Sequence, residues 1–215
     1  ASDTNATGVG NVTVARYGLT GSSSSTHGYS SGGDINNAGG NSNIIDKHSF
    51  AVDSNATDVG DLTITKRASA GHSSVTHGYN AGSRPTNNTI DKWPFASDTN
   101  ATDVGDLTLS RTYPAGQSST THGYSSGGNS GSYNDRIDKF TFATDADATD
   151  VGNLTVAKHV CGGNSSVTHG YTTSGSRSGI PYTDVIEKFT FATDADATDV
   201  GDLTVAKNAV AGTQK

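Results

Sequence analysis

The segment Ala56-Thr-Asp-Val-Gly-Asp-Leu-Thr63 decides the fold, because the chain repeats it at regular distances. The segment recurs at 101–108, at 148–155 with asparagine at position 153, and at 197–204, and a degenerate copy occupies 6–13. From one copy to the next its central glycine is displaced by about 50, 45, 47 and 49 residues, which is a period typical of solenoids and propellers. The sequence therefore predicts a repeat architecture.

Two further motifs accompany this segment in a constant order. Thr-His-Gly-Tyr occurs at 26–29, 76–79, 121–124 and 168–171, and Ile-Asp-Lys occurs at 45–47, 90–92 and 137–139, with Ile-Glu-Lys at 186–188. We interpret residues 1–215 as one repeat domain, with a partial N-terminal unit (1–16) and a partial C-terminal segment (208–215). The predicted complete units span about 17–66, 67–111, 112–158 and 159–207.

Each complete unit is expected to contain four short strands. In the third unit these are 115–120, 122–126, the alternating aromatic segment 137–143 and the segment 151–157, with an aspartate-rich turn at 144–149 before the last. No stretch shows a sustained helical period. Four strands in about 48 residues predict an all-β fold, a small β-propeller with four to five blades.

Composition narrows the classes of function. Hydrophobic residues make up 31% of the chain and charged residues 16%, and the net charge is −7. An acidic balance argues against a nucleic-acid partner, because phosphate contacts need clustered Lys and Arg. No apolar run approaches the length of a membrane span, so we expect no membrane insertion. The lone Cys161 permits no intrachain disulfide.

The apolar residues of the third and fourth strands form the predicted core. The first strand of each unit is rich in Gly and Ser, and such small side chains suit few blades that converge closely. The predicted core residues are Val59, Leu62, Ile90, Phe95, Val104, Leu107, Phe140, Phe142, Val151, Leu154, Phe189, Phe191, Val200 and Leu203.

The units resemble divergent Kelch-type propeller blades. Tyr-Ser-Ser-Gly-Gly at 29–33 and 124–128 matches the aromatic residue and Gly-Gly pair of that family, although Val59, Val104, Val151 and Val200 replace its fourth-strand tryptophan. The sequence pattern Asp-Lys-Phe…Ala-Thr-Asp-Val-Gly-Asp-Leu is also similar to repeats in structural proteins of marine bacteriophages. That resemblance implies a virion or extracellular location, as part of a fibre or surface, with other structural subunits or further copies of itself as partners.

Recurring aromatic and imidazole side chains are the first candidates for ligand binding. One interpretation is a ring that binds a metal or a sugar. The alternative is structural, with each imidazole holding a backbone group or Thr hydroxyl inside its own unit. The candidates are His27, Tyr29, His77, Tyr79, His122, Tyr124, His169 and Tyr171.

The acidic turns are the candidate metal site. Closely spaced carboxylates can bind calcium, but the turns lack the glycine and terminal glutamate of a calcium loop, and Asp also forms turns with its own backbone. We therefore expect no obligatory cofactor and keep calcium as the alternative. The candidate ligands are Asp145, Asp147, Asp150, Asp194, Asp196, Asp199 and Asp202.

No unique Ser, His and Asp combination suggests catalysis, so the chain is predicted to be a non-enzymatic structural or binding module. One alternative is a lectin with a shallow glycan site per blade in the variable loops 34–43, 83–88, 129–135 and 176–183. A second alternative is a propeller hydrolase or epimerase. For the chain ends, we favour a closed ring in which the N-terminal copy of the fourth strand packs beside the final unit. The alternatives are a fragment of a ring of five or more blades and an open array whose ends pair with neighbouring subunits.

Overall fold

The computed structural model describes residues 6–35 and 40–212, and every regular element in these ranges is a β-strand. Sixteen strands form four separate four-stranded antiparallel sheets, each with its strands in chain order. The predicted all-β class is confirmed. The calls on 1–5, on 36–39 within the first variable loop and on 213–215 lie outside the described residues.

Each sheet lies within one of the four complete units, and we number the sheets 1 to 4 accordingly. Sheet 1 contains β1 (Thr20–Ser23), β2 (His27–Ser31), β3 (Ser42–Ser49) and β4 (Thr57–Lys66). Sheet 2 contains β5 (Ala70–Ser73), β6 (His77–Ser83), β7 (Asn87–Pro94) and β8 (Thr102–Asp106). Sheet 3 contains β9 (Ala115–Ser118), β10 (His122–Ser126), β11 (Arg136–Thr141) and β12 (Thr149–Asn153). Sheet 4 contains β13 (Gly162–Ser165), β14 (His169–Thr173), β15 (Thr183–Thr190) and β16 (Thr198–Lys207).

The fourth strand begins earlier than the sequence predicted. In sheet 3 it starts at Thr149 instead of Val151, because the backbone of the acidic segment already pairs there with Lys139 of β11. The register between these strands shifts between Ile137 and Asp138, and similar shifts occur in the other three sheets. Such a bulge bends the strand and increases its twist.

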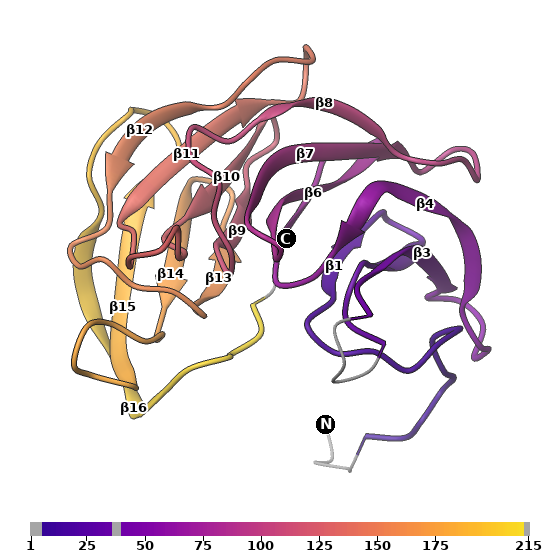
Figure 1. Cartoon of the computed structure of the whole chain (residues 1–215), viewed down its shortest axis with the longest axis horizontal. Helices are drawn as coiled ribbons and strands as arrows, with labels where there is room; N and C mark the ends of the chain where they lie inside the picture. Colours follow the sequence, from indigo (N-terminus) through magenta and orange to yellow (C-terminus); the bar gives the residue numbers. More distant parts are fainter. Residues whose placement is uncertain (1–5, 36–39, 213–215) are drawn as a thin grey trace.

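The four sheets stand around one axis, with their first strands innermost (Figure 1). β1 neighbours β5, β5 neighbours β9, and β9 neighbours β13. Glycine permits this approach: a Cβ atom on Gly116 would collide with the backbone of Gly71, and one on Gly163 would collide with Gly116. The small first-strand residues therefore bring the backbones together at the axis.

A second set of backbone bonds joins the connections between the units. The N–H of Ala68 donates to the carbonyl of Gly18 (2.7 Å), Tyr113 to Ala68 (2.7 Å), Val160 to Tyr113 (3.3 Å) and Ala209 to Val160 (3.0 Å). Each donor has a positive φ, between 52° and 57°. This chain of bonds places residues 209–212 beside β13, where the first strand of another unit would begin.

Apolar packing occurs between neighbouring sheets as well as within them. In one cluster, Tyr124, Ile137 and Leu154 of unit 3 contact Phe189 and Ala197 of unit 4. Equivalent clusters join sheet 1 to unit 2 and sheet 2 to unit 3. Most predicted core residues lie in these clusters, but Val200 is 46% exposed, because no further sheet among the described residues covers β16.

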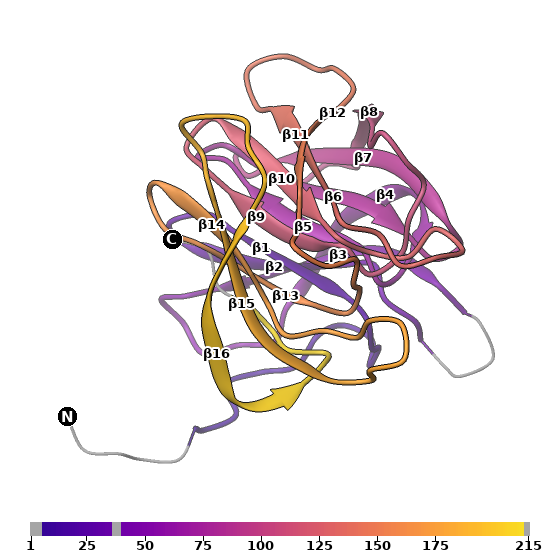
Figure 2. The same ribbon diagram turned by 90° about the vertical axis from the view of Figure 1, so that its left-hand side faces the viewer.

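The sheets form an open arc, and the closed ring that the sequence predicted is not seen. Figure 1 shows the opening between β16 and the N-terminal segment, and the turned view in Figure 2 shows β16 at the near side of the molecule. The predicted packing of the N-terminal segment beside the final unit is wrong. Asn11 bonds with Asn55 (3.0 Å), and Arg16 pairs with Asp46 (2.9 Å), so this segment lies against sheet 1.

Candidate functional site

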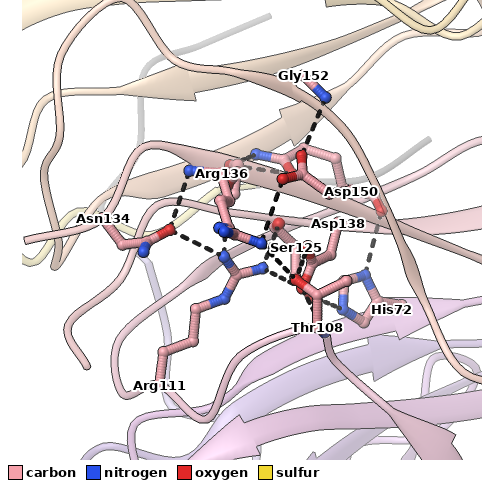
Figure 3. Close-up of polar contacts among 11 residues, drawn as sticks. His72, Thr108, Arg111, Ser125, Asn134, Arg136, Asp138, Asp150 and Gly152 are labelled. Carbon is pink, nitrogen blue, oxygen red and sulfur yellow. Dashed lines mark hydrogen bonds and ion pairs between the residues drawn. The ribbon is translucent and has the colours of Figure 1, made fainter.

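A buried ion pair connects each unit to the next. Arg111, which follows sheet 2, reaches Asp138 of β11, with its Nη2 2.9 Å from Oδ2 and both side chains fully buried (Figure 3). The same carboxylate accepts hydrogen bonds from the backbone N–H (3.0 Å) and hydroxyl (2.7 Å) of Thr108. Burial lowers the pKa of Arg111, and the charge of Asp138 opposes that shift. A buried charge needs such a partner, so this contact specifies how the units pack.

The same contact recurs at three other places. Each time, a cation that ends a fourth-strand segment pairs with the acidic residue of the next Ile-Asp-Lys or Ile-Glu-Lys motif. The other three pairs are Arg16–Asp46, Lys66–Asp91 and Lys158–Glu187, at 2.9, 2.9 and 2.5 Å, with side chains at most 2% exposed.

Outer contacts accompany the buried pairs. The lysine of the Ile-Asp-Lys motif reaches the acidic turn of the next unit: Lys139 Nζ lies 2.5 Å from Asp194, and Lys92 pairs with Asp145. In the same turn, Asp196 accepts a hydrogen bond from the backbone of Asn153 (2.9 Å). The acidic turns therefore bind the preceding unit.

The seven candidate calcium ligands have differing surroundings. Asp150 and Asp199 bond the backbone N–H groups of Gly152 and Gly201, as expected for turns that Asp forms with its own backbone. Asp147 accepts from the backbone of Asp106 (3.0 Å). The carboxylate of Asp202 has no hydrogen bond or ion pair within 6–35 and 40–212, while its backbone pairs with Val185 of β15. In these ranges no group of three His, Cys, Asp or Glu residues has the arrangement of a metal site.

The candidate histidines lie one per sheet, at the turn between the first two strands. His122 Nδ1 lies 2.8 Å from the Thr121 hydroxyl, and Ser119 Oγ accepts from the His122 backbone N–H (3.0 Å). The same bonds form at His27, His77 and His169. The Ser-x-Thr-His sequence thus builds a turn, and the structure brings each imidazole to its own threonine.

The candidate tyrosines lie between sheets. Tyr29, Tyr79 and Tyr124 are 4%, 1% and 2% exposed, and each stacks on a phenylalanine of the next unit with ring centroids 4.8 Å apart. Burial raises the pKa of Tyr124 to about 12. Tyr171 of sheet 4 is half-buried and has no phenylalanine against it among the described residues. Three of the four rings are therefore used in packing.

Three of the four variable loops contribute to the wall of a cavity of about 660 Å³, which we call the loop-end pocket. Loops of the first three units and the connections between sheets form its wall. Its lining residues are Asn41, Arg67, Arg84, Pro85, Thr86, Thr112, Tyr113, Asn129, Gly131 and His159. The loops of units 3 and 4 also line a second cavity, with Ser132, Tyr133 and Arg177 in its wall.

Neighbouring residues bind some polar groups of this pocket and leave others without a hydrogen-bond or ion-pair partner. Asn41 donates to the carbonyl of Arg84 (3.0 Å), while its Oδ1 atom is buried and has no partner among the described residues. Arg67 pairs with Asp34, yet its Nε is likewise unpartnered. Arg84 is exposed and forms no ion pair in the described part of the chain. Of these groups, the exposed guanidinium of Arg84 is the one that the pocket offers to a ligand.

Two aromatic rings complete the wall. Tyr113 and His159 meet edge to face with centroids 5.9 Å apart. Burial lowers the pKa of His159, so the ring is favoured in its neutral form. Amide, guanidinium and ring groups together suit a polar ligand with both hydroxyl and apolar faces.

Sequence reasoning missed the buried ion pairs and the composition of this pocket. A signal for the pairs existed: a Lys or Arg follows the fourth-strand motif at the same distance in every unit, at Arg16, Lys66, Arg111, Lys158 and Lys207. The pocket had no such signal, because its residues come from positions where the units differ.

Comparisons with known proteins name no family for this chain. No family model matches the chain, and a search of the curated proteins finds no match either. Across the described ranges, no helix has the length and apolar character needed to cross a membrane.

Proposed function

We propose that the chain is a non-enzymatic structural and binding module of the propeller class, in which a repeated scaffold presents variable loops to a ligand. The proposal rests on one observation: the repeated charged residues hold neighbouring units together, whereas residues that differ between the units line a pocket. Recurring acids and bases pair with each other between units, as Arg111 does with Asp138. The variable residues line the loop-end pocket.

Glycans are the ligand class that this pocket suits best. A sugar presents hydroxyl groups to amides and guanidinium groups and an apolar face to rings, and Asn41, Arg84 and Tyr113 supply these partners. The resemblance to Kelch-type blades, and the similarity of the repeats to those of marine bacteriophage structural proteins, support a virion or extracellular setting. A surface glycan is an available ligand in such a setting.

A glycan array tests this proposal. We expect the labelled chain to bind a defined group of glycans, and Arg84→Ala to weaken that binding about tenfold, the effect of losing one charge-assisted hydrogen bond. Arg177→Ala is the matched control, because Arg177 lies in the corresponding loop of unit 4 and lines a different cavity. No bound glycan, or equal binding by the two variants, would contradict the proposal.

A further inference from the structure

The wall of the loop-end pocket comes largely from two positions that recur in every unit. At these positions two backbone segments pair in a short antiparallel bridge. The four bridges join Tyr17 to Asp34, Arg67 to Arg84, Thr112 to Asn129 and His159 to Ser176. Five of these eight residues line the pocket. The same backbone arrangement therefore presents different side chains in each unit, and these side chains determine what the pocket can bind.

Unit 2 differs from the other units because both of its bridge positions carry a cation. The Arg67 N–H donates to the carbonyl of Arg84 (3.2 Å), and the Arg84 N–H donates to the carbonyl of Arg67 (2.8 Å). Side chains of a directly opposed pair lie on the same face, where like charges repel and destabilise the pairing. None of the other three bridges joins two cations. An anion beside these two arginines would relieve the repulsion.

One of the two arginines is already neutralised within the chain. Arg67 pairs with Asp34, whose side chain is fully buried, and its Nη1 donates a hydrogen bond to the hydroxyl of Tyr17 (2.8 Å). The guanidinium of Arg84 is exposed and has no ion pair in the described ranges. The pocket therefore contains one cationic group without a counter-charge.

The described lining residues supply no carboxylate to balance Arg84. They include two arginines and no Asp or Glu, although the chain as a whole carries a net charge of −7. Burial lowers the pKa of His159, so its ring is favoured in the neutral form and adds little positive charge. The pocket is thus a local positive site on an acidic protein, and its concave wall concentrates the electric field there.

Backbone contacts fix the position of Arg84. Besides its two bonds with Arg67, its carbonyl accepts a hydrogen bond from the side-chain amide of Asn41 (3.0 Å). Pro85 follows it in the chain, and the proline ring restricts φ to a narrow range. Because the backbone is already ordered, little of its freedom is lost when a ligand binds.

We propose that the ligand of the loop-end pocket is an acidic glycan whose carboxylate pairs with Arg84, which rests on the glycan binding proposed above. A guanidinium is planar and donates two parallel hydrogen bonds, a geometry that matches the two oxygens of a carboxylate. Thr86 and Asn129 line the same pocket and supply partners for the hydroxyl groups of the sugar, while Tyr113 supplies an apolar surface.

Paired glycans on an array test this proposal. The array carries glycans that contain a uronate or a sialate, each beside the same glycan with its carboxylate reduced to a primary alcohol. We expect the unmodified chain to bind the carboxylated member of a pair about tenfold more tightly, the effect of one charge-assisted hydrogen-bonded contact. Arg84→Gln should bind both members equally, because the side-chain amide remains but the charge is lost. Arg84→Lys should recover part of the preference, since it restores the charge without the planar pair of donors.

Arg177→Ala is the matched control and should keep the tenfold preference, because Arg177 lines a different cavity. Arg84→Gln should melt at no lower temperature than the unmodified chain, since it removes a like charge opposite Arg67. A loss of preference in this variant then reflects the site and not unfolding.

A carboxylate preference that survives in Arg84→Gln would overturn the proposal, because the anion would then have another partner. Equal binding of the paired glycans by the unmodified chain, or binding of neutral glycans alone, would also overturn it and would leave glycan binding itself intact. Absence of binding to every glycan would contradict the proposed function together with this ligand class.

Discussion

Residues 148–158 and 197–207 have the same sequence except at position 153 and its counterpart 202, yet their surroundings differ. In the first segment, Lys158 is 2% exposed and pairs with Glu187 of the next unit. In the second, Lys207 is exposed and Val200 is 46% exposed. The contrast teaches that the next unit, and not the local sequence, determines whether these side chains are buried.

Replacing the terminal lysine of each segment should give the largest difference. Lys158→Met leaves Glu187 buried without its partner, so we expect the free energy of unfolding to fall by about 3–5 kcal/mol. Lys207→Met removes an exposed lysine and should change it by less than about 0.5 kcal/mol. Urea denaturation measures both values, and similar losses in the two variants would contradict the comparison.

Acid should weaken the interior contacts through His72. This fully buried side chain lies 3.1 Å from Ser125 Oγ of sheet 3, and burial lowers its pKa to about 4. The unfolded chain binds a proton near pH 6.5 and the folded chain does not, so stability falls as the pH drops from 6.5 to about 4. The pKa difference corresponds to about 3 kcal/mol.

The measurement for His72 compares the unmodified chain with His72→Gln. Urea denaturation at the two ends of that pH range should show that the variant lacks about 3 kcal/mol of the acid-induced loss. An identical loss in both proteins would show that other groups cause the pH dependence.

Glycine replacements test the backbone contact alone. Gly152 and Gly201 have similar positive φ values, 154° and 143°, so alanine strains both backbones alike. Only at Gly152 would the new Cβ meet the next unit, 2.5 Å from Ala195. We expect Gly152→Ala to lose about 1–3 kcal/mol more stability than Gly201→Ala, the usual cost of overpacking. Equal losses by thermal denaturation would show that strain dominates.

Chelation should have the smallest effect. The acidic turns bind the preceding unit through lysines and backbone N–H groups, as Asp194 and Asp196 do. We therefore expect excess chelator to leave the melting temperature unchanged. A fall of several degrees that calcium reverses would favour the metal interpretation, because a bound ligand stabilises only the folded state.

The sequence predicted the order of the strands because each motif carries local information. The alternating Phe140 and Phe142 indicate a strand, and the Ser-x-Thr-His segment before Tyr124 lies at a turn that its own side chains build. These features depend on neighbouring residues, so one repeat is enough to recognise them. The repetition then extends the assignment along the chain.

The burial of charged residues could not be predicted in the same way. A lysine such as Lys158 is normally exposed, and its partner Glu187 lies 29 positions further along the chain. Ring closure also escaped prediction, because it depends on how the first and last sheets meet and not on any motif. The loop-end pocket combines residues of several units that share no pattern.

The ion pairs have a polarity, with the cation always contributed by the earlier unit and the acid by the later one. A unit inserted anywhere in the series would meet a compatible surface on both sides. Tandem duplication of the corresponding stretch of gene would thus lengthen the protein without new compensating mutations, and loss of one copy would shorten it equally simply. The arrangement thus allows the number of units to change while the amino-acid sequence of each repeat stays the same.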